Sequence, residues 1–383
     1  METVYLDHNA TTPLEPRVLA AMMPWLEGGG NASSLHSYGR RCREAVEIAR
    51  DQVASLLGVG PPEVVFTASG TEANNAVLRT VAEGLDSGHL VISAFEHPSI
   101  LAAARRLEEQ GFEVSRVDPE ASGRIAPEAV AEELRDDTLL VCLMLANNEV
   151  GAVQPIAEVS RLAHERGVPV LCDAVQAVGK IPFDASELGA DYLTIGAHKF
   201  YGPLGAAALW IRRGAAFSPL LVGGSHERHR RAGTLNVPAI VGLGAASALV
   251  EREIDQWSAA MRRIRDGFES RLSALGGTSV HAANVARLPN TSNVAFDGID
   301  AEALMVRLDL RGLAVSTGSA CSSGVVEISE TMRAMGVSEA QALGSLRISF
   351  GKDSTEEALD RLMEALVEEV ETLRRLGEPE VAR

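Results

Sequence analysis

Short runs of apolar, often β-branched residues alternate with helix-length segments along this 383-residue chain as far as about residue 212. Several runs are apolar at every position, which is typical of strands covered on both faces. The alternation predicts an α/β fold whose large domain holds a mostly parallel seven-stranded sheet between layers of helices. The predicted strands are Glu63–Thr67, His89–Ala94, Phe112–Val117, Thr138–Ala146, Val168–Asp173, Tyr192–Gly196 and Ala206–Ile211. The predicted helices are Arg43–Leu57, Thr71–Glu83, Ser99–Gln110, Pro127–Leu134 and Ile156–Arg166.

The pattern changes in the second half of the chain. A loop rich in Gly, His and Arg, Val222–Thr234, precedes a helix of small residues, Pro238–Val250. That helix runs into a long charged helix over Glu251–Leu275. Two later runs, Thr291–Phe296 and Gly344–Ser349, predict strands of a second, smaller sheet.

The last helix is predicted to begin at a capping box, Ser354–Thr–Glu–Glu357, and it carries an apolar stripe. These features predict two domains. The large α/β domain spans residues 15–250, and a smaller C-terminal α+β domain combines residues 1–14 with residues 251–383.

Charge and composition disfavour several classes of function. The formal net charge is −17, and only 4% of the residues are aromatic. Such a field repels nucleic-acid backbones and anionic lipid, and few rings are available to stack on bases. No segment approaches the roughly 20 apolar residues of a spanning helix. Direct binding to nucleic acid or to a membrane is therefore not expected.

The cysteines and the first residues bear on location. Met1–Thr12 lacks the basic and apolar regions of a secretory signal. The four cysteines are scattered, without the paired spacing of a zinc site, so no metal site is expected. A reducing cytoplasm is the expected compartment.

Polar residues follow the predicted strands at their carboxyl ends, where open α/β sheets bind ligands. Gly70 and Thr71 follow the first strand and lie at the N-terminus of a helix. Free backbone N–H groups, the helix dipole and a hydroxyl in that place form a cradle for an anion. The alternative is that these residues only cap the helix, and the pattern alone leaves both open.

Later strands also end in side chains that can carry chemistry. His97 follows the second strand, Asn148 follows the fourth, and Asp173 ends the fifth. An Asp that ends an apolar strand is costly to bury unless it faces a cation or a ligand. We therefore expect Asp173 to face a ligand.

The chain has only three lysines, and one of them follows the sixth strand. This is Lys199, which His198 precedes; we interpret Lys180 and Lys352 as surface lysines. A phosphate cradle, a carboxylate, a histidine that stacks on a ring and a lysine are the groups that pyridoxal phosphate requires. The lysine forms a Schiff base with the aldehyde, and the carboxylate keeps the pyridine nitrogen protonated.

A set of motifs extends over nearly the whole chain in order. They are Tyr5–Leu–Asp–His–Asn–Ala–Thr–Thr12, Ser69–Gly–Thr–Glu72, Glu96–His97, Asn147–Asn–Glu–Val–Gly151, Asp173–Ala–Val–Gln176, Ala197–His–Lys199, Tyr201–Gly–Pro203 and Gly318–Ser–Ala–Cys–Ser–Ser–Gly324. Together they resemble the motifs of class V, fold-type I pyridoxal-phosphate enzymes, and the last resembles the active-cysteine loop of NifS/IscS-type cysteine desulfurases.

The resemblance implies roles in binding the cofactor ring. Lys199 would hold pyridoxal phosphate as a Schiff base, and Asp173 would pair with the pyridinium nitrogen. His97 would stack on the ring and assist proton transfer. Gln176 and Asn148 would contact the phenolate oxygen or neighbouring groups.

It also implies which residues bind the phosphate and the substrate. Gly70, Thr71 and His198 would bind the phosphate, and Thr234 would reach it from the other subunit of a homodimer. Arg347 would clamp the carboxylate of the substrate with two hydrogen bonds. Relatives often carry a Ser where this chain has Gly196, so one phosphate ligand is replaced or missing here.

The implied reaction converts L-cysteine to L-alanine and leaves a persulfide on Cys321, whose thiolate is the nucleophile. Sulfur-acceptor proteins, such as an iron–sulfur scaffold or a thiolation relay, would then take the sulfur, and the sequence does not choose between them. The alternatives are a selenocysteine lyase, another class V aminotransferase-like enzyme, or a non-catalytic scaffold. For Cys321 itself, the alternative is a buried small residue.

Overall fold

The computed structural model of the protein describes residues 3–318 and 328–377. Its largest feature is a seven-stranded sheet in the order β2-β8-β7-β6-β5-β3-β4. Only β8 runs antiparallel to its neighbours, so the predicted mostly parallel sheet is confirmed. The strands are β2 Val64–Thr67, β3 His89–Ser93, β4 Glu113–Val117, β5 Thr138–Met144, β6 Val170–Asp173, β7 Tyr192–Gly196 and β8 Ala207–Ile211.

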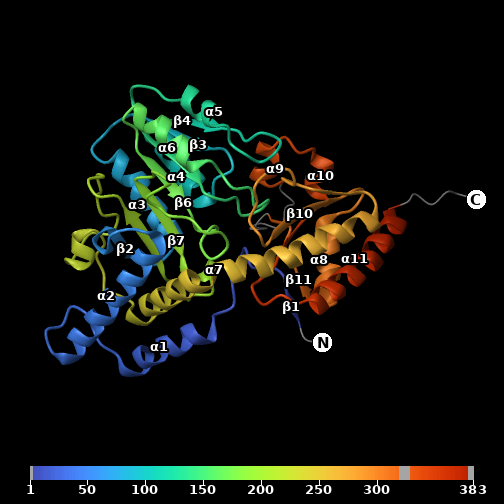
Figure 1. Ribbon diagram of the computed structural model, residues 1–383. Coiled ribbons are helices and arrows are strands. Elements are labelled where there is room, and N and C mark those ends of the chain that lie inside the picture. The colour runs from blue at the N-terminus through green and yellow to red at the C-terminus, as the bar shows by residue number, and fades with distance from the viewer. Residues whose placement is uncertain (1–2, 319–327, 378–383) are drawn as a thin grey trace, which may run out of the picture.

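Helices cover both faces of this sheet, as the all-apolar strands predict (Figure 1). In β5, Leu140 and Cys142 pack in one apolar cluster with α3 and α4, whereas Val141 and Leu143 pack in another with α2, α6 and α7. The alternation follows from the two-residue period of a strand. These helices are α1 Pro16–Gly28, α2 Ser37–Leu57, α3 Gly70–Ala82, α4 Pro98–Glu108, α5 Pro127–Glu132, α6 Ile156–Glu165 and α7 Val237–Leu272, with short 3-10 turns η1 Pro61–Glu63, η2 Ala197–Lys199, η3 His226–His229 and η4 Ser273–Leu275.

The second sheet is antiparallel and has the order β12-β10-β9. Beside it, the N-terminal strand β1 pairs with β11 in parallel. The strands are β1 Val4–Tyr5, β9 Thr278–Val280, β10 Thr291–Phe296, β11 Leu313–Ala314 and β12 Ser345–Ser349. The helices are α8 Ala301–Leu310, α9 Glu330–Ala334, α10 Glu339–Leu343 and α11 Glu356–Gly377. The two strands that the sequence predicted are thus β10 and β12.

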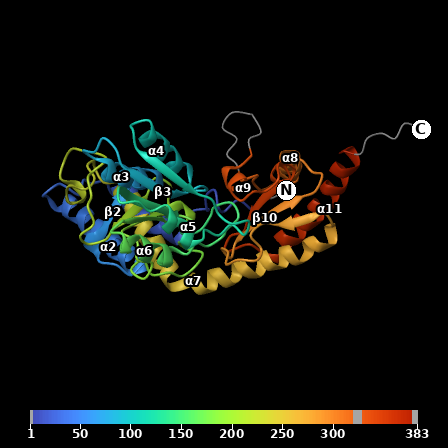
Figure 2. The ribbon, with the colours of Figure 1, turned by 90° about the horizontal axis from the view of Figure 1, so that it is seen from above.

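Helix α7 links the two sheets (Figures 1 and 2). The two helices predicted from residue 238 onward form one continuous 36-residue helix. Its first part, including Ile240 and Leu243, packs on the large sheet, and its last part, including Phe268 and Leu272, packs on the small one. The domain boundary proposed at residue 250 lies inside this helix.

The start of the last helix differs from the prediction by one residue. Thr355, not Ser354, caps α11, because its Oγ1 accepts a hydrogen bond from the Ala358 N–H at 3.2 Å. The hydroxyl of Ser354 is already used, since it accepts from the Gly351 N–H at 2.9 Å. Among the described residues, no helix has both the length and the apolar character needed to cross a bilayer.

Candidate active site

A cavity of about 420 Å³ lies at the carboxyl ends of β3, β5, β6 and β7. Arg347 of β12 and the segment that follows β1 also line it. The structure therefore brings residues from both ends of the chain to the edge of the large sheet. The predicted site residues that line the cavity are Gly70, Thr71, His97, Asn148, Asp173, Gln176, His198, Lys199 and Arg347. Their individual roles stay predictions.

Two predicted site residues do not line the cavity. Thr234 is exposed in the loop between β8 and α7. Cys321 lies outside the described residues. Ser316 and Gly318, which precede Cys321 in the chain, do line the cavity.

Asp173 is buried at the end of β6, and both of its carboxylate oxygens accept hydrogen bonds. Oδ2 accepts from the Asn74 amide at 2.8 Å, and Oδ1 accepts from the Val175 N–H at 3.0 Å. Asn74 belongs to α3, the helix whose N-terminus forms the predicted anion cradle. These bonds hold the carboxylate in place with its charge directed at the cavity.

His97 is fixed by the same group of residues. The Ser99 N–H donates to its Nδ1 at 3.1 Å, and the Ser99 hydroxyl lies 2.8 Å from the same nitrogen. Asn74 donates in turn to that hydroxyl at 3.0 Å. The network assigns Nδ1 as the acceptor, so the proton of the neutral ring is on Nε2. Burial lowers the pKa of His97, which favours this neutral form.

Lys199 follows β7 in η2 and lies against the N-terminal segment. Its Nζ donates to the carbonyl oxygens of Asn9 and Ala10, each at 2.6 Å. Burial, and after it the positive charge of Arg347, lowers the pKa of Lys199 to about 8. Asp7 opposes part of this shift. The amine can therefore change its protonation state near neutral pH.

His198 belongs to the same turn and is also tied to the N-terminal segment. Its carbonyl oxygen accepts from the N–H and the hydroxyl of Thr12 at 2.8 and 3.0 Å. Its ring Nδ1 lies 3.2 Å from the hydroxyl of Thr11. Burial, with the nearby Lys199, lowers the pKa of His198 to about 4, so the ring is neutral at physiological pH.

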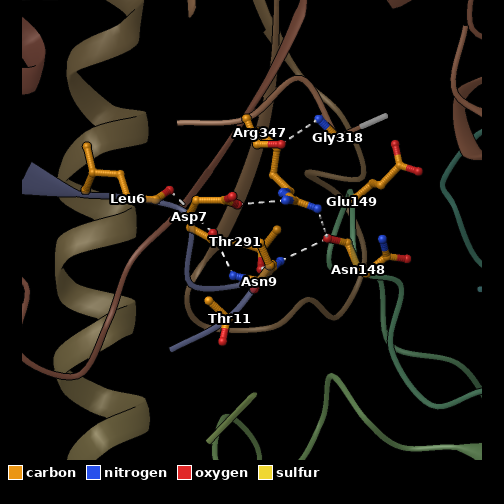
Figure 3. A network of polar contacts seen from close by, with 12 residues as sticks. Leu6, Asp7, Asn9, Thr11, Asn148, Glu149, Thr291, Gly318 and Arg347 are labelled. Carbon is orange, nitrogen blue, oxygen red and sulfur yellow. Dashed lines mark hydrogen bonds and ion pairs between the residues drawn. The ribbon is translucent and has the colours of Figure 1, made fainter. Parts of the chain in front are cut away.

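Arg347 is buried on β12 between two segments that are remote in sequence (Figure 3). One terminal nitrogen pairs with Asp7 at 2.7 Å, and the other donates to the Asn148 carbonyl at 3.1 Å. Its buried Nε has no partner among the described residues. The guanidinium therefore retains one donor without a described partner, and Arg347 lines the cavity.

The predicted anion cradle is present at the start of α3. Ser69 caps this helix, because its hydroxyl accepts from the Glu72 N–H at 3.1 Å. Within the described residues, the N–H groups of Gly70 and Thr71 and the hydroxyl of Thr71 have no hydrogen-bond partner. Since Ser69 performs the capping, these donors are free to bind an anion.

The donor set fits pyridoxal phosphate. Free N–H groups at a helix N-terminus suit the phosphate, a held carboxylate suits the ring nitrogen, and an amine suits the aldehyde. One further buried polar atom, Oδ1 of Asn74, lacks a partner among the described residues. The residues that carry these groups, Asn74 included, all line one cavity.

The two lysines interpreted as surface residues are not on the surface. Lys180 is buried, with 2% of its surface exposed. Lys352 is half-buried, and its Nζ pairs with Glu15 at 2.9 Å and with Asp353 at 2.7 Å. Local pattern gave no sign of the pair with Glu15, because Glu15 lies more than 300 residues away in the chain.

The sequence analysis assigned no role to several residues that shape the site. Asp7 and Asn9 belong to a motif that was quoted only for its resemblance, and both line the cavity. Asn74 and Ser99 support Asp173 and His97. Spacing could have identified Asn74, because it lies one helical turn beyond Thr71 and so on the same face of the helix.

Gly196 ends β7 with φ of −132°, a conformation open to any residue. A Cβ added there would come no closer than 3.6 Å to its neighbours, the nearest being Val175. The space for a larger side chain is therefore present beside His198, which a Cβ would meet at 3.7 Å.

The chain matches known proteins over nearly its full length. The family model Aminotransferase class-V matches residues 4–362. The cysteine desulfurase IscS of Anaeromyxobacter dehalogenans is 44% identical to this chain, over 98% of the chain and 94% of the relative.

Solved structures agree with this match. The structure of a NifS-like protein superposes with a TM-score of 0.89 at 35% identity and covers 98% of this chain and 99% of its own. The structure of SspA in complex with cysteine superposes with a TM-score of 0.82 at 33% identity, covering 92% of this chain and all of its own.

Proposed function

The chain belongs to the class-V aminotransferase family, and from that premise we propose that it is a pyridoxal-phosphate-dependent cysteine desulfurase. It converts L-cysteine to L-alanine and receives the sulfur as a persulfide on Cys321. The observation that carries this proposal is one cavity that holds both Lys199 and an Arg347 with an unused donor. An enzyme that acts on an amino acid with this cofactor needs an amine to bond to the cofactor and a cationic group to bind the carboxylate of the substrate.

The cofactor is held by groups already in place. Gly70 and Thr71 would bind the phosphate, Asp173 would face the ring nitrogen, and Lys199 would bond to the aldehyde. When bound, pyridoxal phosphate supplies an electron sink that stabilises negative charge on the substrate α-carbon. The remaining chemistry belongs to residues of this chain.

Lys199 moves the proton. Its pKa near 8 lets the Nζ accept a proton from the substrate and return it without a large energetic penalty. Without cofactor, the carbonyls of Asn9 and Ala10 hold the amine beside the cavity. His97 lines the same cavity as a neutral ring whose Nε2 carries a proton.

Arg347 orients the substrate. Its ion pair with Asp7 holds the guanidinium in place beside the cavity. The free Nε–H would then donate to a carboxylate oxygen of the substrate, in a cavity that Ser316 and Gly318 also line. Cys321 follows these two residues in the chain by only a few positions.

Cys321 takes the sulfur as a thiolate, because a thiol is a weak nucleophile. The C–S bond of cysteine breaks and an S–S bond to Cys321 forms. The carbon keeps the electron pair and gains a proton, which gives alanine. L-cysteine and the Cys321 thiol thus become L-alanine and a persulfide, and no external oxidant is needed.

The test compares two substrates in the full-length protein and in Cys321→Ser. With L-cysteine, the unchanged protein should release alanine and carry a persulfide on Cys321, both measured by mass spectrometry. Cys321→Ser should retain pyridoxal phosphate and lose alanine release from cysteine. Alanine release from selenocysteine should persist in it, because the weaker C–Se bond does not require the protein thiol. Undiminished turnover of cysteine by this variant would contradict the proposal, and a preference for selenocysteine in the unchanged protein would favour a lyase.

We also propose that the protein acts as a homodimer in which Thr234 completes the site of the partner. Thr234 is exposed and lies outside the cavity of its own chain. Large apolar side chains are exposed on α1 and on nearby loops, as expected of a surface that another subunit covers. They include Leu19, Met23, Leu26, Leu204, Leu221 and Val222.

The loop that carries Thr234 is firmly anchored on the large sheet. Glu227 is buried, pairs with Arg50 through both carboxylate oxygens at 2.7 and 2.9 Å, and accepts the Phe66 N–H at 2.8 Å. Glu227, Arg228 and His229 all have positive φ, a strained conformation for residues other than glycine. The buried pair holds this strained turn and so presents Thr234 to solvent in a fixed place.

Subunit mixing tests the shared site. Lys199→Ala and Thr234→Asp are each expected to be inactive, the second because its charge repels the phosphate. If Thr234 acts in the partner's site, mixed dimers contain one intact site and activity returns on mixing. If Thr234 acts in its own chain, no intact site forms and the mixture stays inactive. Thr234→Ser, which keeps the hydroxyl, is the matched control and should be active alone.

The persulfide must pass to an acceptor protein, for which we propose an iron–sulfur scaffold or a thiolation relay. We place the reaction in the cytoplasm, because a cysteine that carries sulfur must be reduced between turnovers. Capture of proteins that become labelled from a ³⁵S-loaded enzyme identifies the acceptor. Transfer to neither class would refute this part of the proposal.

A further inference from the structure

Lys180 lies buried beside the cavity, although no step of the reaction above uses it. It is 2% exposed, and its Nζ lies 2.5 Å from Oε1 of Gln176 and 3.1 Å from the backbone oxygen of the same residue. Within the described part of the chain, Lys180 forms no ion pair with a carboxylate.

An amine in this place is costly for the fold. Burial, together with the positive charges of Lys199 and Arg347, lowers the pKa of Lys180 well below its usual range. A methionine of similar length would fill the same space without a desolvation penalty. We therefore infer that the amine group of Lys180 has a function that an apolar side chain could not provide.

The amine of Lys180 helps to determine how the side-chain amide of Gln176 is oriented. The amine donates to Oε1 and to the backbone oxygen of Gln176. The amide nitrogen then points the other way, and Nε2 donates to the Asn9 carbonyl at 2.8 Å. A flipped amide would place its oxygen against the Asn9 carbonyl oxygen and would take away the oxygen to which the Lys180 amine donates.

The oriented amide belongs to the same network as the catalytic amine. The Asn9 carbonyl that accepts from Gln176 also accepts from Nζ of Lys199 at 2.6 Å. Gln176 itself lines the cavity, and the second hydrogen of its Nε2 has no partner among the described residues. The Asn9 side chain is fixed from behind by Thr291 and Asn148 (Figure 3).

We propose that Lys180 is a positioning residue that locks Gln176 as a hydrogen-bond donor toward the cavity, where the free N–H meets the ionised ring oxygen of the cofactor. The inference rests on the proposed function, since it assumes that pyridoxal phosphate occupies the cavity. In this proposal Lys180 does not contact the cofactor and influences cofactor binding only through Gln176.

The test is a double-mutant cycle on the full-length protein, with the dissociation constant of pyridoxal phosphate and its absorption maximum as readouts. Lys180→Met should weaken cofactor binding by roughly tenfold and shift the absorption maximum, because the amide loses one of the two partners that orient it. The same substitution in a Gln176→Leu background should change neither, because no amide is left to orient. Equal effects of Lys180→Met in the two backgrounds would overturn the proposal and assign Lys180 a merely structural role.

Two further measurements keep the result interpretable. Lys352→Met removes a lysine outside the cavity and should leave the dissociation constant of the cofactor unchanged.

If Lys180→Met does not fold, Gln176→Glu serves instead. Its carboxylate can pair with Lys180, but its second oxygen faces the Asn9 carbonyl that Nε2 of Gln176 served. The melting temperature therefore serves only to show that the variant folds. Cofactor binding should weaken because an acceptor replaces the donor. Unchanged cofactor binding in Gln176→Glu would overturn the proposal. Failure of the unchanged protein to bind pyridoxal phosphate would instead refute the proposed function.

Discussion

The two sides of the cavity are held in different ways. On the side of the large sheet, Asp173 and His97 have neighbours that satisfy them, and Asn74 and Ser99 connect the two. On the side of the small sheet, Arg347 is held mainly by an ion pair with Asp7, 340 residues away in sequence, and keeps one buried donor without a described partner.

This difference separates two tasks. Groups on the large sheet are preorganised, so they can bind a resident cofactor with little further ordering. The unused donor of Arg347 becomes favourable only when an anionic ligand reaches it. Changes on the large sheet should therefore affect cofactor chemistry, and changes on the small sheet should affect substrate affinity.

Lys199→Ala should give the largest effect. We expect kcat to fall by at least about 10³-fold while the fold persists, because the proton-transfer group is lost. The fold is checked by the melting temperature, and Lys352→Ala is the matched control. In the unchanged protein, borohydride reduction followed by mass spectrometry should locate the cofactor adduct on Lys199. An adduct on Lys180 or Lys352 would contradict the assignment.

The pH dependence of Lys199 should give the next largest effect. In protein freed of cofactor, its pKa of about 8 means that the neutral amine accumulates as pH rises through 8. At pH 8 an amine-reactive reagent should label Lys199 about 10²-fold faster than an ordinary lysine with a pKa near 10.4. The rate should level off above that pH, as measured by peptide mass spectrometry. A rate that keeps rising to pH 10 would show that the site does not lower this pKa.

Arg347→Lys should separate the two sides of the cavity. Lysine keeps the charge but loses the planar pair of donors, so KM for L-cysteine should rise roughly tenfold. The absorption maximum and retention of the cofactor should stay the same. Arg116→Lys, at an exposed ion pair, is the control and should change neither quantity. A loss of cofactor in Arg347→Lys would break the proposed division of tasks.

Gly196→Ser should give the smallest effect, on the cofactor side alone. The backbone conformation suits serine, and the nearest atom would lie 3.6 Å from its Cβ. A hydroxyl beside the cradle of Gly70 and Thr71 should tighten cofactor binding a few-fold through one added hydrogen bond. Equilibrium titration of the cofactor-free protein measures it, with Gly196→Ala as control. Weaker binding in the serine variant would indicate that the phosphate lies elsewhere.

Much of the large sheet could be predicted from the sequence, because a strand's apolar pattern is local. All seven predicted strands are present, and the five helices predicted up to residue 166 start and end within a few residues of prediction, apart from α2, which begins six residues earlier. Helix α1 was not predicted. The gathering of Asp173, His97 and Lys199 followed from topology, since parallel strands place their carboxyl ends at one edge. Resemblance to known motifs added Arg347 and Gln176, which no local pattern distinguishes.

Tertiary structure alone decided which side chains are buried and which polar groups meet. Lys180 was interpreted as a surface lysine, yet the turn after β6 buries it against Gln176, four residues earlier in the chain. The pairing of Asp7 with Arg347 and the contact of Asn9 with Lys199 join segments remote in the chain. Apolar periodicity records which face of an element is buried, because burial is repeated along that element. It does not record the single partner of a buried polar group, because that partner is set by how whole elements pack together.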